Sequence, residues 1–366
     1  MERRNARASA TRGDRFGRPR VFVNGSPLWP PVTGVQRVAR GLAERLLAEA
    51  APNEVRIAGP PLGFGGTRER FPGGRAARLA WEQTVLPAIA HGSHVVNLGN
   101  LAPLASHSTL VLTYDLHTLH APRHYRMGVA SAYWHLASAA YKRASVRCTL
   151  SRTVADELEA TLGGKVDAVV PPGIDAVFVL PGADHHPPAR LGIRTDRPYL
   201  VVVGWAQPSK RADLAIDAHR ALRDRVPHDL VVVGGTKSDY PAARPGGTDA
   251  SVRWVGRLSD ADLAAVYAGS SGLLFPTEYE GFGLPPVEAL ASGASVAASD
   301  LPVLREVLGG LPGVRFVGER TADAWLAAAD ELVTGGDGSS PEERSHAARA
   351  RYPWDGKGRT LLELLD

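Results

Sequence analysis

Residues 276–290 read Pro-Thr-Glu-Tyr-Glu-Gly-Phe-Gly-Leu-Pro-Pro-Val-Glu-Ala-Leu, and this stretch decides the fold. It follows an apolar run at 272–275, contains two glycines, and places two prolines before an apolar, helix-forming sequence. A buried strand, a glycine loop and a helix are predicted in that order, because proline suits the first turn of a helix. The glycines let backbone N–H groups approach a ligand, and a helix start offers unpaired donors with a partial positive charge. The stretch therefore predicts an anion site.

Glu280 and Glu288 flank this predicted anion site. Carboxylates accept hydrogen bonds from hydroxyl groups and not from phosphate, so sugar hydroxyls on both sides of a diphosphate would satisfy both. A simpler interpretation makes Glu280 an exposed loop acid and Glu288 a first-turn acid favoured by the helix dipole. The spacing alone does not decide between these two interpretations.

Short apolar runs that end in glycine or proline extend through the second half of the chain. They lie at 199–203, 230–233, 252–255 and 272–275, with helical stretches expected at 211–223, 260–268 and 286–292. Short β-rich runs separated by helices predict a parallel sheet of βαβ units. Ligands of such sheets bind at the carboxyl ends of the strands, where these glycines lie.

The first half of the chain repeats this pattern. Apolar runs lie at 21–23, 94–98, 110–113, 147–150 and 168–170, and helical periodicity starts at Val35 and after Ser151. Residues 181–198 are rich in proline, histidine and charge without periodicity, so they are expected to link two domains. We therefore predict an α/β protein with two doubly wound, Rossmann-like domains that face a central cleft.

Composition excludes several classes of protein. The chain has 366 residues, of which 44% are hydrophobic and 22% charged, so a disordered, collagenous or coiled-coil protein is not expected. No apolar run approaches the roughly 18 residues of a spanning helix, and the N-terminus lacks the apolar stretch of a secretory signal. The single cysteine, Cys148, excludes an internal disulfide and a cysteine cluster for metal. These features predict a cytoplasmic protein.

Positive charge is concentrated at the N-terminus. Residues 1–20 hold seven arginines and two acids, and residues 176–366 hold 20 basic and 25 acidic groups. An Arg-rich segment without aromatic residues is typical of a solvated, disordered arm, and no nucleic-acid partner is predicted. Peripheral contact with anionic lipid at the inner face of the membrane stays open as the alternative.

The stretch at 276–290 resembles the E-x7-E signature of retaining GT-B glycosyltransferases of family 4, and the match continues through residues 291–293, 299–302 and 304–307. Other segments resemble the same family. Gly204–Lys210 is similar to the segment after the first donor-domain strand, 252–258 to the stretch that lines the nucleobase, and 151–158 with 171–175 to the end of the acceptor domain. Thr33–Val38 is similar to the N-terminal glycine loop of many mannosyl- and rhamnosyltransferases.

The resemblance implies a GT-B fold and assigns roles to its parts. Residues 21–180 would bind the acceptor, 199–350 would bind a nucleotide sugar, and 351–366 would form a helix that returns to the first domain. It implies transfer of a hexosyl or deoxyhexosyl group, with retention, from a nucleoside diphosphate sugar to a glycan or lipid-linked acceptor, in cell-surface polysaccharide synthesis. No cofactor and no metal are expected, and a GDP-mannose or dTDP-rhamnose type of donor is favoured.

The resemblance also implies the site residues. The catalytic candidates are Lys210 for the diphosphate, Glu280 for the sugar hydroxyls and Asp115 for orienting the acceptor or the sugar. The donor is expected to contact Gly204, Lys210, Arg211, Val255, Glu280, Gly281, Phe282, Gly283, Leu284 and Glu288, the last through its ribose hydroxyls. The acceptor side comprises Thr33, Gly34, Arg37, Tyr114 and His117.

The chain departs from the family pattern at two positions. Tyr114-Asp115 stands where the family commonly has His-Asp, and Trp205 stands where many members have arginine. Tyr114 or His117 would replace the histidine, and Lys210, with or without Arg211, would be the diphosphate cation. His117, His120 and His124 have helical spacing, but neither cysteine nor glutamate completes a zinc set nearby.

Other classes of protein stay open at this point. A sugar-nucleotide epimerase on the same scaffold and a catalytically silent binding protein are both compatible with the pattern, because a fold does not fix a function. The sequence leaves the oligomeric state open.

Overall fold

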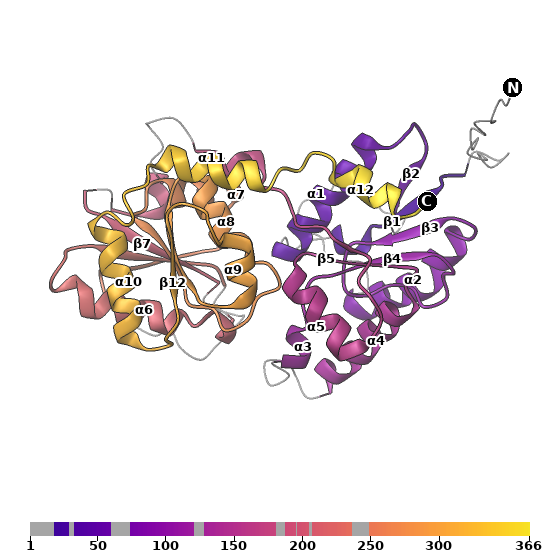
Figure 1. The fold of residues 1–366 in the computed structure, drawn as a ribbon, viewed down its shortest axis with the longest axis horizontal. Coiled ribbons are helices and arrows are strands. Elements are labelled where there is room, and N and C mark those ends of the chain that lie inside the picture. Colours follow the sequence, from indigo (N-terminus) through magenta and orange to yellow (C-terminus); the bar gives the residue numbers. More distant parts are fainter. Residues whose placement is uncertain are drawn as a thin grey trace, which may run out of the picture. The chain divides into compact units, whose positions relative to one another are not determined.

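The structure is a computed structural model, and it describes residues 18–28, 33–59, 74–120, 128–180, 187–194, 196–204, 207–235 and 249–366. Most of the predicted N-terminal arm, residues 1–17, lies outside the described residues, as do Trp205, His124 and part of the predicted linker. The described chain forms two six-stranded sheets flanked by helices (Figure 1).

The first sheet has the strand order β2-β1-β3-β4-β5-β6, and the pairs β1–β2, β1–β3, β3–β4 and β5–β6 are parallel. The strands are β1 (Val21–Asn24), β2 (Val55–Ala58), β3 (His94–Asn97), β4 (Thr109–Thr113), β5 (Val146–Thr149) and β6 (Ala168–Val169). The helices are α1 (Gly34–Glu49), α2 (Gly74–Ile89), α3 (His117–His120), α4 (Val129–Arg143) and α5 (Arg152–Leu162), with a short 3-10 turn at Ser26–Leu28.

The second sheet has the order β12-β11-β10-β7-β8-β9 and is parallel throughout. Its strands are β7 (Tyr199–Val203), β8 (Asp229–Val233), β9 (Val252–Gly256), β10 (Gly272–Phe275), β11 (Ser295–Ser299) and β12 (Val314–Val317). The helices are α6 (Ala212–Arg223), α7 (Asp260–Ala268), α8 (Leu284–Ala291), α9 (Pro302–Leu308), α10 (Ala322–Thr334) and α11 (Pro341–Arg351). The last helix, α12 (Lys357–Glu363), packs against α1 beside the first sheet. Turns of 3-10 helix lie at Ala176–Phe178, Ala189–Leu191 and Pro208–Lys210.

The core of the second sheet explains why its central strands read as continuous apolar runs. Leu200, Val202, Leu230 and Leu274 are fully buried and pack with Trp325 of α10. Helices α6 and α10 contact each other on one side of these strands, and α8 contacts β10 and β11 (Figure 1). A parallel strand covered on both faces needs apolar residues at every position. The predicted α/β architecture with two Rossmann-like parallel sheets is confirmed.

The chain divides into two compact units. The first comprises Met1–Val111, Arg143–Val146 and Gly356–Asp366, and the second comprises Leu112–Lys142 and Arg147–Asp355. Within the first unit α12 packs against α1 so closely that a Cβ on Gly358 would lie 2.3 Å from Arg45 O. Residues 351–366 therefore hold the end of α11 and the separate helix α12, where a single helix was predicted.

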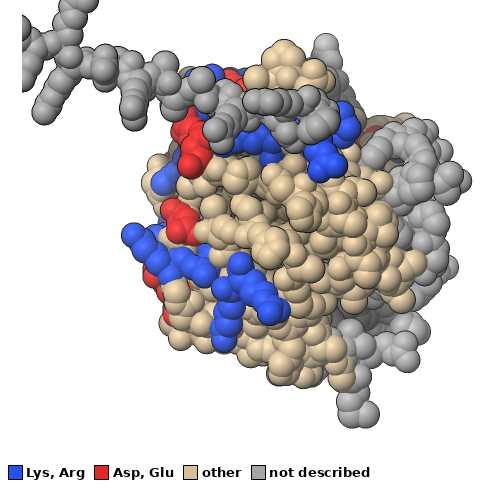
Figure 2. All heavy atoms as spheres, turned by 90° about the vertical axis from the view of Figure 1, so that its right-hand side faces the viewer, with Lys and Arg blue, Asp and Glu red and all other residues tan. Residues whose placement is uncertain are grey.

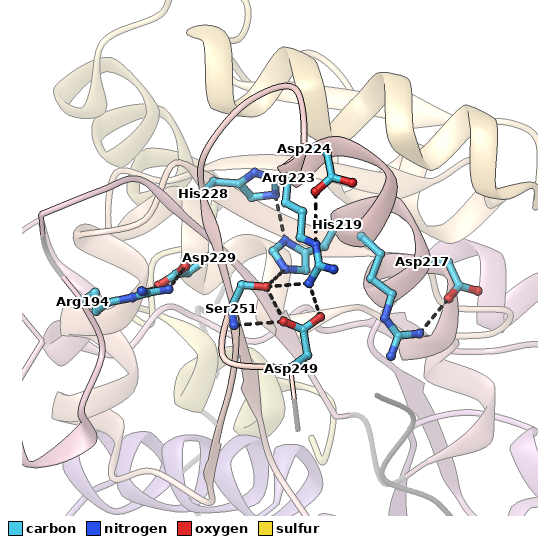
Figure 3. A network of polar contacts seen from close by, with 10 residues as sticks. Arg194, Asp217, His219, Arg223, Asp224, His228, Asp229, Asp249 and Ser251 are labelled. Atoms are coloured by element: carbon cyan, nitrogen blue, oxygen red, sulfur yellow. Dashed lines mark hydrogen bonds and ion pairs between the residues drawn. The ribbon is translucent and has the colours of Figure 1, made fainter. Parts of the chain in front are cut away.

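A buried polar network lies at the amino ends of β8 and β9 (Figure 3). The His219 ring on α6 has Nδ1 2.9 Å from His228 Nε2 and Nε2 2.9 Å from Ser251 Oγ. Both histidine rings are almost completely buried. Burial first, and then the nearby His228, lower the pKa of His219 to about 3, while Asp249 raises it and Arg223 and Arg220 lower it.

No helix within the described ranges combines the length and the apolar character that crossing a membrane requires.

Candidate functional site

The glycine loop between β10 and α8 has the order that the sequence predicts. Gly283 caps α8 with φ 91°, a left-handed conformation that favours glycine. A Cβ at this position would also lie 2.8 Å from Leu304 Cδ2. The helix begins at Leu284, two residues earlier than predicted, because both prolines fall inside its first turn.

The loop is held against the 3-10 turn at Pro208–Lys210. Glu278 N donates to Ser209 O over 2.8 Å, and the buried Thr277 Oγ1 lies 3.2 Å from the same carbonyl. Thr277 Oγ1 is also 3.1 Å from Tyr279 O. The turn that carries Lys210 and the loop that carries Glu280 are therefore joined directly, through the carbonyl of Ser209.

Lys210 and Glu280 form an ion pair. Their side chains are 16% and 12% exposed, so the pair is shielded from water without being sealed from it. The ammonium also lies 5.2 Å from the centroid of the Phe275 ring. A lysine ammonium has three donors, and Glu280 takes one of them. The exposed-acid interpretation of Glu280 is therefore wrong.

Gly204 makes room for the Lys210 side chain at the end of β7. Its φ is 85°, and a Cβ would lie 3.1 Å from Lys210 Cγ. Gly204 N donates to Val233 O over 2.9 Å, which ties this turn to the end of the neighbouring β8. The two glycines at 204 and 283 thus lie at carboxyl ends of strands in the second sheet.

Arg211 has partners that the sequence did not indicate. Its guanidinium donates to Glu278 over 3.0 Å and to Asp213 over 2.8 to 3.1 Å, and these carboxylates raise its pKa. The residue has φ 47°, a left-handed conformation that is uncommon without glycine and joins the 3-10 turn to α6. Arg211 is therefore held in place beside Lys210 by two carboxylates.

Glu288 lies one turn inside α8 and is 4% exposed, which does not fit a solvated first-turn acid. Phe282 is also buried, and its ring packs edge-on to Tyr352 with the centroids 5.3 Å apart. Leu284 is half-buried at the start of α8, and Val255 is half-buried in β9.

The segment after β4 approaches the glycine loop within the second unit. A Cβ at Gly281 would lie 2.0 Å from Tyr114 O and 3.1 Å from Asp115 Cβ. Ser151 Oγ donates to Gly281 O over 2.8 Å. Only glycine fits at position 281, and this fit brings Asp115 to the loop that carries Glu280.

The Asp115 carboxylate is half-buried and accepts a hydrogen bond from His117 N over 3.0 Å. Burial raises the pKa of Asp115 most, and the charge of Glu280 raises it further. His117, through its backbone N–H and its charge, and then Lys210 lower that pKa. The second unit therefore brings the three predicted catalytic residues into one electrostatic group.

The predicted acceptor residues are divided between the two units. Thr33, Gly34 and Arg37 belong to the first unit, where Thr33 caps α1 and Thr33 N donates to Gln36 Oε1 over 3.1 Å. Tyr114 is buried, which raises the pKa of its hydroxyl. The described residues contain no group of three or more His, Cys, Asp or Glu that could hold a metal ion.

Sequence reasoning missed Tyr279 and Glu157. Tyr279 Oη donates to Glu157 Oε2 over 2.9 Å and accepts from Leu116 N over 2.9 Å. The only signal in the sequence is that Tyr279 directly precedes Glu280. Its partners are more than a hundred residues away along the chain, so no local pattern indicates them.

The sheet orders and the glycine loop define a GT-B class of α/β fold. Residues 187–351, which hold the second sheet, match the family model described as "Glycosyl transferases group 1". Sucrose-phosphate synthase from Thermosynechococcus elongatus superposes with a TM-score of 0.70 at 17% identity, over 95% of this chain and 98% of that one.

Two further proteins are similar to this chain. Anabaena Alr3699/HepE, solved in complex with UDP and glucose, gives a TM-score of 0.67 at 16% identity, over 94% of this chain and 98% of that one. D-inositol 3-phosphate glycosyltransferase of Actinosynnema mirum is 31% identical over 211 residues, which cover 53% of this chain and 50% of the relative. The match thus spans half the length of that relative, and the structural likenesses, at these identities, are likenesses of fold.

Proposed function

We propose that the protein is a retaining glycosyltransferase that moves a hexosyl or deoxyhexosyl group from a nucleoside diphosphate sugar to a hydroxyl of its acceptor. The observation that carries this proposal is the Lys210–Glu280 pair at the glycine loop before α8. A cation, a hydroxyl-binding carboxylate and a helix start within one site suit a sugar diphosphate. The family match over residues 187–351 supports the same class of reaction.

In the proposed reaction the bond between the anomeric carbon and the β-phosphate oxygen breaks, and negative charge builds on the diphosphate. Lys210 and the N–H groups at the start of α8 stabilise that charge without a metal ion, as preorganised donors do. The acceptor oxygen bonds to the anomeric carbon on the face from which the diphosphate leaves, and a diphosphate oxygen takes the acceptor proton. Glu280 holds sugar hydroxyls, Glu288 holds the ribose hydroxyls and Asp115 orients the sugar or the acceptor.

For the donor we propose a GDP-mannose or dTDP-rhamnose type, on the resemblance of residues 33–38 to transferases of those sugars. For the acceptor we propose a glycan or a lipid-linked saccharide of cell-surface polysaccharide synthesis, reached by peripheral contact with the cytoplasmic face of the membrane. Figure 2 shows a largely uncharged face with groups of Lys and Arg side chains, and fewer Asp and Glu side chains, around it. Such a face supports contact with anionic lipid.

The first experiment screens the purified protein for a rise in melting temperature with UDP, GDP and dTDP and then with the matching nucleotide sugars. Ligand that binds only the folded state raises apparent stability by mass action. The stabilising sugar nucleotide is then incubated with and without candidate acceptors, and diphosphate release is measured. Acceptor-dependent release supports transfer, whereas conversion of the sugar without release would identify an epimerase.

The variant Lys210→Ala tests the role of the ammonium in the same assay. Its kcat should fall by about 100-fold or more, because preorganised charge stabilisation of this kind contributes several kcal/mol. The exposed Lys165 provides the matched control, and Lys165→Ala should keep wild-type kcat. A Lys210→Ala protein that stays within a few-fold of wild type would refute the proposed site.

A further inference from the structure

We propose that Tyr279 is a positioning residue that holds Glu280 and Asp115 at a fixed separation, a role that rests on the proposed function. Tyr279 directly precedes Glu280, and the amide that donates to its hydroxyl, Leu116 N, directly follows Asp115. One side chain therefore joins the two carboxylate-bearing segments, one residue away from each carboxylate.

The Tyr279 hydroxyl is used in both directions. It accepts from Leu116 N over 2.9 Å and donates its single proton to Glu157 Oε2 over 2.9 Å. Burial most of all, and then the charges of Asp115 and Glu157, raise the pKa of Tyr279, so the hydroxyl keeps its proton. The donor role toward Glu157 is thus fixed across the neutral pH range.

Glu157 lies on α5, and a second contact holds its carboxylate in place. Its second oxygen, Oε1, contacts Nε2 of the His120 ring on α3. The rings of His120 and His117 lie 4.9 and 5.8 Å from the Tyr279 ring, centroid to centroid. The Tyr279 side chain therefore has contacts at its ring, from the two histidines, as well as at its hydroxyl.

Glu280 is fixed on both sides along the chain. Tyr279 before it is tied to Glu157 and Leu116, and Gly281 after it accepts from Ser151 Oγ over 2.8 Å. The charge of Glu280 raises the pKa of Asp115, which means that the two carboxylates repel each other. The Tyr279 hydroxyl holds their backbones together against this repulsion.

The test is Tyr279→Phe, which keeps the ring contacts and removes only the hydroxyl. We expect kcat to fall about ten- to hundredfold, since small displacements of positioning groups cost this much. The donor KM should change less than about threefold, because Lys210 and Glu288 still bind the nucleotide. The control is Tyr141→Phe, since the buried Tyr141 hydroxyl has no hydrogen-bond partner within the described part of the chain. It should keep wild-type kcat.

A second pair of variants separates positioning from folding. Glu157→Gln keeps an acceptor for the hydroxyl and should retain most of the activity, whereas Glu157→Leu removes one of the two contacts of the hydroxyl and should lose part of the kcat that Tyr279→Phe loses. The double variant Tyr279→Phe/Glu157→Leu should lose no more than Tyr279→Phe alone, because Tyr279→Phe already removes the contact with Glu157. Additive losses, or a kcat of Tyr279→Phe within twofold of wild type, would overturn the proposal. So would a rise in KM at constant kcat.

Amide hydrogen exchange separates failure of this proposal from failure of the proposed function. If the wild-type protein turns over no nucleotide sugar, the proposed function fails. The positioning role of the Tyr279 hydroxyl is then judged from amide hydrogen exchange alone. Tyr279→Phe should then speed exchange in the segment 276–283 and leave α10 unchanged. Unchanged exchange at 276–283 would show that the hydroxyl fixes nothing.

Discussion

The roles proposed for single residues of the site can be tested separately, and Glu288 tests the proposed contact with the nucleotide. The side chain is buried within the second turn of α8, so a charged carboxylate there needs hydrogen-bond partners. Glu288→Gln keeps the shape and removes the charge. We expect the donor KM to rise about tenfold with kcat nearly unchanged, since hydrogen bonds to a charged acceptor exceed neutral ones by about 1 kcal/mol or more. An unchanged KM would remove the ribose role.

Gly281 gives a second prediction at this scale. A Cβ would lie 2.0 Å from Tyr114 O, so Gly281→Ala must displace either the loop or the segment after β4. We expect a stability loss of about 1–3 kcal/mol and a large fall in kcat. Chemical denaturation and initial-rate kinetics measure the two effects. Gly318→Ala is the control, because its Cβ would meet nothing closer than 3.8 Å.

The sequence could predict those site residues that lie in motifs local in the chain. Glu280, Glu288 and Lys210 lie in short motifs marked by glycine and proline, and such motifs can be recognised in a single sequence. The approach of Asp115 to Gly281 and the tie from Tyr279 to Glu157 join positions far apart in the chain. Only the folded sheet brings them together, so no spacing pattern could indicate them.

Among the strands of the structure, β8, β9 and β10 were predicted, whereas β2, β11 and β12 were missed. β8 and β10 are buried at every position. β2 lies at the edge of its sheet, includes the exposed Arg56, and is half-buried at Val55 and Ile57. An edge strand needs apolar residues on fewer positions, so its sequence resembles a loop. In the segment 351–366, which was expected to form a helix that returns to the first domain, α12 packs against α1, and Pro353 lies between the end of α11 and the start of α12.

His219 of α6 and His228, which directly precedes β8, form a buried pair that predicts acid-sensitive stability (Figure 3). The unfolded chain binds a proton on His219 near pH 6.5, and the folded chain does so near pH 3. Stability is therefore complete above pH 6.5 and is lost as the pH falls toward 3. Between pH 7 and pH 5 this histidine should cost about 2 kcal/mol.

Urea unfolding at several pH values measures this effect. The variant His219→Asn should be less stable at pH 7 but should show a shallower loss between pH 7 and pH 5. The exposed His135 on α4 is the control, and His135→Gln should keep the wild-type slope. Equal slopes in wild type and His219→Asn would contradict the prediction.

At the scale of the whole molecule, the stability of the first unit is expected to depend on α12, which joins it from the far end of the chain. Leu361 is fully buried, Arg359 N donates to Glu49 Oε2 over 2.9 Å, and Asp366 pairs with Arg20. Deleting residues 357–366 exposes the α1 face that these residues cover. We expect α1 amides to exchange much faster in the deletion variant, while α10 amides in the second unit keep their protection. Uniform loss of protection in both would mean that the units unfold together.

The discontinuous make-up of the first unit has a consequence for synthesis on the ribosome. Its last segment, Gly356–Asp366, is separated from Val111 by the whole of the second unit and by the short stretch Arg143–Val146 of the first unit. A nascent chain therefore cannot complete the first unit until the segment Gly356–Asp366 has been added and has left the exit tunnel. The larger unit can fold before that point, and the α1 surface that α12 covers stays open until then.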